Sequence, residues 1–531
     1  MNTEQNGYFI PTNAPRDAYG SLIPPQAPAF TPLKPAFEVK PHDRIFAWLS
    51  LPLGFLFVRY ALVHTNGYLT TAVFLVLHLL SLLYIRRCGC RPQGTHRLLG
   101  AVLAAFTLVF SLTASSLLHA LCFVFLLAGE LWRIHAVCGN VSFVTRFFPY
   151  DLLEVLTQPL KKMGAGKASI EESVKQSKSV STVKTVILAV LITVPLTVIV
   201  GALLAKADPG MEALFRKLGN LLTDNVLALI FQAAAGIPAG FYLFGGWYGA
   251  GERRIFGFKS DAAYTETFAK FRVIPSLAVY AGVTPVCVLY LLYVRSQAAY
   301  FFSAFAGKLP GDMIYSDYAR RGFFELCAVA VINLIVLLVM SGCAKYAGRR
   351  PKMMTVYVTA ICLFTLFIIS TAVAKMALYI EAYGLTRQRL YTTWFMLLLA
   401  VGFICIIVRQ FAERFPTAGV ITGAAIVMFG VLCFSRPDAL IAKYNISRYE
   451  QHTLADLDVY MLTELSDDAY AVMMKKFDVI EQAGKYKTFE KAAKRRIGSY
   501  EDDPYQKWNV SAADFLANYA LVTAQMEADN E

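Results

Sequence analysis

The sequence predicts an all-α, polytopic membrane protein with about eleven transmembrane helices and a small soluble helical domain at the carboxyl end. Of its 531 residues, 56% are hydrophobic and only 16% are charged, and the mean hydropathy is +0.49. A soluble domain needs a polar surface at any size, so it cannot hold this apolar excess. The apolar residues also gather in runs of about 20, which cross the roughly 30 Å hydrocarbon layer as helices. After Pro437 such runs cease.

Eleven segments have the length and composition of a membrane span: 45–64, 68–85, 98–112, 115–133, 185–205, 225–247, 273–294, 322–341, 354–382, 390–408 and 417–435. As one helix, the stretch 98–137 would be about 60 Å long at 1.5 Å per residue. That length exceeds the bilayer core, so the stretch is predicted to form two crossings with a break near Thr113–Ser116.

The chain divides into five regions by composition. They are a proline-rich, disordered tail (1–44), a four-helix membrane region (45–137), an interfacial segment with a linker (138–184), a seven-helix membrane region (185–436) and an acidic helical domain (437–531). The tail has no apolar periodicity, which is typical of disorder. The alternation of aromatic, aliphatic and charged residues after 141 is typical of a segment that lies along the membrane surface.

Basic residues mark one side of the membrane. They flank alternate spans, and those at the amino-terminal side include Arg44, Arg86, Arg97, Arg133 and Lys345. The positive-inside rule therefore predicts a cytoplasmic amino terminus. The first apolar segment lacks a cleavage site and is predicted to be a signal anchor. An odd number of spans then predicts that the carboxyl terminus lies outside.

The net charge of +13 hides an asymmetry. Residues 437–531 contain 11 Lys or Arg against 17 Asp or Glu, a net charge of −6. The basic excess therefore belongs to the membrane region and is a topology signal. Nucleic acid is not an expected partner, because no basic domain is present to bind it.

The acidic domain is predicted to be helical because its apolar residues recur with helical spacing. The segments concerned are 453–482, 486–497 and 510–527. Ser466–Asp468 are predicted to cap one helix. Ser511 with Asp514 is predicted to form a capping box at the start of another.

Two apolar segments meet in a very short turn around Gly384, a residue suited to the left-handed backbone that ends a helix. Residues equally far from the turn become neighbours, so Glu381 is predicted to lie near Arg387 or Arg389. Lys375 lies about 9 Å deeper along the first helix. Ionisable residues at this depth are costly and are functional candidates. Two interpretations are open: an ion pair that fixes the hairpin, or charges that line a polar cavity.

A second charged group supports the cavity hypothesis. Glu325 lies about one turn inside the eighth span, where it can pair with Arg321 on the same helix. We predict one polar vestibule near one membrane face, with scattered local pairs as the alternative. The candidate residues are Arg59, Asp224, Arg320, Arg321, Glu325, Lys375, Glu381, Arg387 and Arg389.

No catalytic or metal-binding pattern stands out, so the chain is predicted not to be an enzyme and no cofactor is assigned. The ten cysteines lie in or beside spans and form no disulfide framework. Cys88-Gly89-Cys90 is interpreted as an ordinary reduced loop, with lipidation or metal binding as alternatives.

Long motifs in the second half of the chain resemble a bacterial family of multi-pass membrane proteins. The motifs are YIEAYGLTRQRLYTTWFM at 379–396 and YARRGFFEL at 318–326, and the likeness continues into RPDALIAKYNI and LDVYMLTELSDDA in the tail. The family is identified as domain of unknown function 4173, which is related to domain 4153. The resemblance implies a bacterial inner-membrane location and supplies no activity, cofactor or catalytic residue.

Two functions remain open from the sequence. The first is a permease-like protein that transports or handles a lipid or small molecule, supported by the number of spans and the buried charges. The second is a signalling or envelope-assembly component whose carboxyl-terminal domain binds a protein partner. Both place the protein in contact with the lipid bilayer.

Overall fold

The structure of the protein is a computed structural model that describes residues 37–63, 67–141, 144, 147–175, 193, 200, 224–251, 261–305, 323–345, 351–502 and 508–530. Within these ranges the chain is almost entirely helical, which confirms the all-α fold class. Nine helices in the described part are long and apolar enough to cross a membrane. The tail up to residue 36 and most of the predicted span 185–205 lie outside the described residues.

A first helix group forms from the amino-terminal half and shares one apolar core. Its members are α1 (Pro41–Phe57) with the π-turn η1 (Val58–Val63), α2 (Tyr68–Arg87), α3 (Thr95–Phe106), α4 (Val109–Leu112), α5 (Ser116–Val137), α6 (Phe148–Lys175) and α9 (Asp224–Gly251). Helices α3 and α4 together make one span that ends at Leu112. The predicted break before Ser116 is therefore confirmed.

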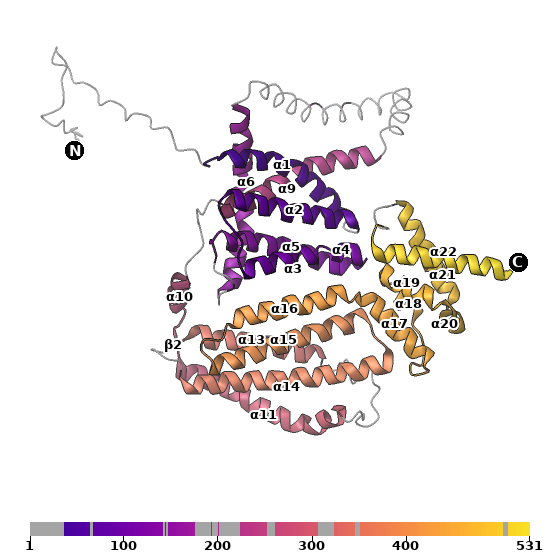
Figure 1. Cartoon of the computed structure of the whole chain (residues 1–531). Coiled ribbons are helices and arrows are strands. Elements are labelled where there is room, and N and C mark those ends of the chain that lie inside the picture. The colour runs from indigo at the N-terminus through magenta and orange to yellow at the C-terminus, as the bar shows by residue number, and fades with distance from the viewer. Residues whose placement is uncertain are drawn as a thin grey trace, which may run out of the picture.

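Helix α6 runs across the spanning helices at the end where α1 begins (Figure 1). Arg44 of α1 faces Glu172 of α6 at 3.8 Å, and the indole of Trp48 donates to Ser173 at 3.3 Å. Helix α6 falls within the segment 138–184, part of which the sequence predicts to lie along the membrane surface. The helix also continues through the first part of the predicted linker, because small residues there pack against α9: a Cβ on Gly166 would meet the ring of Phe241 at 2.7 Å.

A second helix group contains α11 (Ser276–Phe305), α13 (Phe323–Cys343), α14 (Lys352–Tyr383), α15 (Arg387–Phe411) and α16 (Thr417–Phe434). A short helix, α10 (Asp261–Ala269), precedes it, and β1 (Ile274–Pro275) pairs in parallel with β2 (Ala344–Lys345). Helix α16 packs on α15 and on α4. Its Phe429 stacks on Phe106 of the first group with centroids 5.5 Å apart, so α16 joins the two groups.

The carboxyl-terminal domain is a separate helical unit with its own apolar core. It contains α17 (Pro437–Glu450), α18 (Val459–Thr463), α19 (Asp467–Lys475), α20 (Phe477–Gln482), α21 (Tyr486–Asp502) and α22 (Val510–Asn530). Figure 1 shows this domain, in yellow, against the ends of the spanning helices opposite to α6. It covers the turn between α4 and α5 and the turn between α14 and α15.

Helices α1 and α9 cross with their backbones in contact. A Cβ on Gly236 would lie 2.7 Å from Cα and 2.8 Å from N of Phe55, and the Cβ positions of Gly54 and Gly240 meet backbone in the same way. Gly236 and Gly240 form a GxxxG motif, which lets membrane helices approach closely enough for dispersion contacts. Any side chain at this crossing must push the helices apart.

Gly236→Ala is therefore expected to destabilise the protein by about 1–3 kcal/mol, the cost of overpacking a tight contact. The matched control is Gly282→Ala in α11, where a Cβ meets no atom within 4 Å. That control is expected to be neutral or slightly stabilising, because alanine favours helix. The measurement is the thermal unfolding midpoint of the full chain in detergent. Equal midpoints for the two variants would contradict the proposed crossing.

Candidate functional site

The turn between α14 and α15 is held by the carboxyl-terminal domain. Gly384 ends α14 with φ +77°, as the sequence predicts. The amide of Asn445 in α17 pairs with the backbone of Leu385: Leu385 N donates to Oδ1 at 2.7 Å and Nδ2 donates to Leu385 O at 2.8 Å. A Cβ on Gly384 would lie 3.2 Å from Cγ of Asn445 and closer still to its oxygen. Glycine is thus required both by the backbone angle and by this contact.

Arg387, at the start of α15, reaches Asp438 of α17 and not Glu381. Its Nε donates to Oδ1 at 2.8 Å and its Nη2 donates to Oδ2 at 2.5 Å. Asp438 is fully buried and also accepts from the amide of Ser466 at 3.1 Å. Forked pairs of this kind combine strong hydrogen bonds with a fixed orientation. The arginine of the hairpin therefore anchors the carboxyl-terminal domain on the second helix group.

Asp468 makes the equivalent contact with the first helix group. Its fully buried carboxylate accepts from Arg436 Nε at 2.6 Å and from the amide of Ala114 at 3.2 Å. The hydroxyls of Thr113 and Ser511 donate to it as well. Thr113 and Ala114 form the turn between α4 and α5, so one carboxylate joins three parts of the chain. We call Arg387, Asp438, Arg436, Asp468 and Asn445 the docking seam.

The predicted helix caps in this domain need correction. Ser466 does occupy the N-cap position of α19, but its hydroxyl donates to Asp468 Oδ2 at 3.1 Å and not to the helix backbone. The predicted capping box at Ser511 is wrong: Asn509 precedes α22 and accepts from the amide of Ala512 at 2.9 Å. The single hydroxyl proton of Ser511 is instead shared between Asp468 and, at 2.9 Å, the carbonyl of Leu112. Both hydroxyls contact Asp468 of the docking seam. A local sequence pattern cannot predict contacts that depend on how the domain docks.

The remaining charges of the hairpin have local roles. Arg389 lies over the ring of Tyr379 at 4.0 Å, and its Nη1 donates to Tyr383 O at 3.0 Å and also to Gly384 O. It thereby satisfies carbonyls that α14 leaves open at its end. The carbonyl of Glu381 accepts from Arg448 at 2.9 Å, and Glu381 lines a groove of about 590 Å³ between α14 and α15.

The other candidates lie elsewhere or outside the described residues. Arg59 is in η1 and donates to Gln232 of α9 at 2.9 Å. Lys375 is half-buried on α14. For Asp224 and Glu325 the structure describes the helix, α9 and α13 respectively, but not the side chain, and Arg320 and Arg321 lie outside the described residues. Since η1 packs on α9 whereas α14 packs on α11, α13 and α15, the seven candidates on described helices divide between the two helix groups.

A buried charged cluster within the first helix group escaped the sequence analysis. Arg133 Nε donates to Glu130 Oε2 at 3.0 Å, and His78 Nδ1 lies 3.0 Å from the same oxygen. The arginine side chain is 1% exposed. We interpreted Arg133 as a topology signal at a membrane boundary, whereas its side chain turns back along α5 to an acidic residue. Glu130 three residues before Arg133 in an apolar run was the signal for this pair.

An apolar cleft separates the two helix groups. It has a volume of about 450 Å³ and is lined by residues of α3, α5, α6, α15 and α16, among them Phe125, Trp132, Phe148, Trp394, Gly423 and Phe429. Thr422 carries the one hydroxyl among the lining side chains. The indole N–H of Trp394 donates to Met428 O at 2.9 Å. The buried indole N–H of Trp132 has no acceptor within the described part of the chain.

Cys88 is a poor candidate for modification. It follows α2 directly, and its Sγ lies 3.5 Å from Nε2 of His42. Burial, followed by the negative charge of Asp43, raises the pKa of the Cys88 thiol to about 11. The thiol is therefore protonated at neutral pH, and a protonated thiol is a weak nucleophile and a weak metal ligand.

The comparisons with known proteins place the chain in a family without assigning it an activity. A family model described as Domain of unknown function (DUF4153) matches residues 51–475. The matched region extends from α1 through both helix groups to the end of α19, so it contains the whole docking seam. The narrower identification with domain 4173 is not confirmed. No match was found among curated proteins or among solved structures.

The docking seam predicts a large difference between buried and exposed ion pairs. Asp438→Asn is expected to lower the stability of the protein by about 1.5–3 kcal/mol, because Arg387 loses a charged, two-point partner. The control is Glu450→Gln, which removes the exposed pair that Glu450 makes with Lys476 at 3.0 Å and should cost at most about 1 kcal/mol. Thermal unfolding and limited trypsin digestion of the full chain measure both. An equal loss of stability in the two variants would contradict a stabilising role for the docking seam.

Proposed function

Because the chain belongs to the DUF4153 family, whose description names no activity, we propose from its geometry that this integral membrane protein handles a lipid or lipid-like small molecule. In this proposal the apolar cleft between the helix groups holds the apolar part of that molecule. The proposal covers binding and movement of the ligand and assigns no chemical reaction.

The observation that carries the proposal is the lining of the cleft. Its volume of about 450 Å³ falls in the range of small-molecule sites, about 300–1,000 Å³. The lining combines aromatic rings and glycines with hardly any polar group, which suits a hydrocarbon chain. The N–H of Trp132, which has no acceptor among the described residues, supplies one donor, and a buried donor without an acceptor is costly. A ligand with a long apolar part and an oxygen acceptor would satisfy both features.

The position of the cleft also supports the proposal. It lies between two helix groups that are joined along α16 and held at one end by the docking seam, and α6 borders it at the other end. A small change in the packing of α16 on α3 and α5 would open or close it. Transporters commonly move one bundle against another around a site of this kind.

We infer the orientation from the distribution of charge. Basic side chains gather at the end of the bundle where α1 begins, among them Arg44, Arg86, Arg87, Arg97 and Lys345. The carboxyl-terminal domain lies at the opposite end (Figure 1). The positive-inside rule then supports a cytoplasmic amino terminus in a bacterial inner membrane and an extracytoplasmic carboxyl-terminal domain.

The predicted vestibule is retained only in a narrower form. What supports it is that Glu381 lines a groove of about 590 Å³, whose other lining side chains are apolar apart from Ser370. Arg387 and Arg389 are engaged in holding the hairpin and the domain. The alternative proposal is a signalling or envelope-assembly component whose carboxyl-terminal domain binds a protein partner.

Filling the cleft tests the proposal. At Gly423 a Cβ meets no atom within 4 Å, so Gly423→Leu adds a side chain to the cleft without a backbone clash. Gly402→Leu in α15 is the matched control, since Gly402 is equally open and does not line the cleft. The leucine should weaken ligand binding by about 1–3 kcal/mol, the usual cost of overpacking.

The measurement is native mass spectrometry of the full chain released from lipid nanodiscs. The wild type and Gly402→Leu are expected to keep the same bound lipid, while Gly423→Leu loses it. The proposal fails if all three proteins carry the same lipid complement, or if none carries any.

A further inference from the structure

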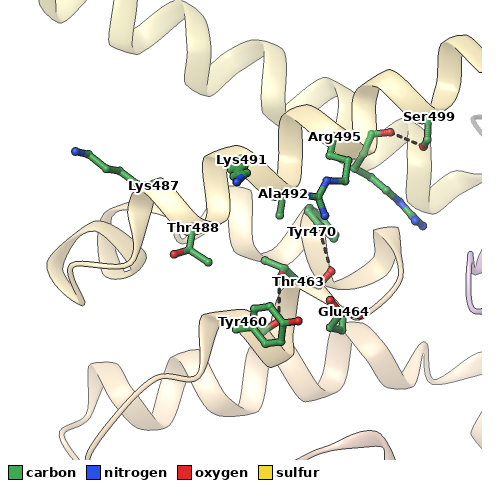
Figure 2. A pocket seen from close by; sticks show the side chains of 11 residues that line it. Tyr460, Thr463, Glu464, Tyr470, Lys487, Thr488, Lys491, Ala492, Arg495 and Ser499 are labelled. Carbon is green, nitrogen blue, oxygen red and sulfur yellow. Dashed lines mark hydrogen bonds between the residues drawn. The ribbon is translucent and has the colours of Figure 1, made fainter.

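The carboxyl-terminal domain carries a cationic groove of about 670 Å³ between α21 on one side and α18 with the start of α19 on the other. Lys487, Lys491 and Arg495 line it from α21 at intervals of four residues, so they share one face of the helix. Figure 2 shows Arg495 reaching from α21 toward Tyr470 and Thr463 on the facing wall.

The three groove cations differ from their neighbours on the same helix. Lys494 pairs with Glu490 at 2.6 Å, and Arg496 pairs with Asp467 at 2.5 Å. Lys487, Lys491 and Arg495 are exposed, and no described carboxylate forms an ion pair with them. Like charges four residues apart on a helix repel and destabilise it. These three residues, called the cationic stripe, therefore lower the stability of α21 unless a bound anion neutralises them.

The charge of the surrounding domain makes the groove more distinctive. Six of the 11 basic residues in 437–531 fall within 485–496, although the domain has 17 acidic residues. Glu464 is the one acidic side chain among the lining residues. In a domain with this net negative charge, a groove lined by three cations attracts anions that the domain as a whole repels.

The facing wall is rigid and partly aromatic. Tyr470 is buried and donates its hydroxyl to Thr463 O at 2.9 Å, which fixes the floor of the groove. Tyr460 is 69% exposed and offers a ring face beside the cations. The hydroxyls of Thr463 and Thr488 also line the groove. Cations, hydroxyls and one exposed ring suit an anion attached to a larger polar or ring-bearing group.

We propose that the cationic groove binds a phosphate-bearing ligand through Lys487, Lys491 and Arg495. The compact charge and several acceptor oxygens of a phosphate match lysine and arginine donors. The groove adjoins the membrane end of the domain, because the carbonyl of Glu464 accepts from Arg387 at 3.3 Å. A phospholipid headgroup and a soluble phosphorylated molecule share this chemistry. The proposal does not depend on the apolar cleft.

The test uses the full chain in phosphatidylcholine nanodiscs and titration calorimetry. Sodium tripolyphosphate is the soluble probe, and dihexanoyl phosphatidylglycerol is the lipid probe, with dihexanoyl phosphatidylcholine as a zwitterionic counterpart whose phosphate charge is offset by its own ammonium group. The test variant combines Lys487→Gln, Lys491→Gln and Arg495→Gln. The control variant, Lys476→Gln with Lys485→Gln and Lys494→Gln, removes the same charge from exposed pairs of the same domain.

The test variant is expected to bind the preferred probe at least about tenfold more weakly than the wild type, because several charged hydrogen bonds are lost. The control should stay within about twofold of the wild type, since exposed pairs contribute little. Binding of tripolyphosphate alone assigns a soluble ligand, and binding of phosphatidylglycerol alone assigns a lipid headgroup. The melting temperature of the test variant should not fall, because its repulsive stripe is removed.

Equal weakening in the test and control variants would overturn the proposal, because only net charge would then matter. Binding of neither probe by the wild type, or binding that the test variant leaves unchanged, would overturn it as well. A drop in the melting temperature of the test variant alone would show that the stripe has a structural role instead.

Discussion

The buried carboxylate of Asp468 is the constraint on which the arrangement of this protein depends. A charge without solvent costs several kcal/mol unless hydrogen bonds and an opposite charge surround it. Its partners come from the turn between α4 and α5, from the start of α17 and from α22. The buried carboxylate of Asp438 is compensated in the same way by Arg387 of the second helix group. Asp468 needs the first helix group and Asp438 needs the second, so both carboxylates are satisfied together only when the carboxyl-terminal domain sits on both groups.

This seam explains how two loosely joined helix groups form one molecule. Along the bilayer they meet mainly through α16, whose Phe429 stacks on Phe106, and an apolar cleft remains between them. The docking seam holds the two groups at one end of the cleft, and α6 borders the cleft at the other end. The same domain presents its cationic groove beside Arg387. Apolar and cationic sites thus lie on opposite sides of the seam.

The spans could be predicted because the bilayer fixes the length and polarity of each helix, and the turn at Gly384 could be predicted because few residues adopt its backbone. The partner of Arg387 could not, since Asp438 lies 51 residues away in another domain. The buried pair of Glu130 and Arg133 was not predicted, because a basic residue near the end of a span is normally taken as a signal of membrane orientation. The close crossing at Gly236 could have been predicted, because Gly236 and Gly240 form a GxxxG motif. The shared vestibule remains a hypothesis.

Hydrogen exchange at the seam tests the central claim most directly. The amides of Ala114, Leu385 and Ser466 donate to Asp468, Asn445 and Asp438 respectively. If the domain is locked on both helix groups, these three amides exchange slowly and open together with the core of the domain. Peptide-resolved exchange of the full chain in nanodiscs provides the rates. Fast exchange at Ala114 and Leu385, with the domain core still protected, would contradict the account, because the domain would then be tethered to the membrane helices and not docked on them.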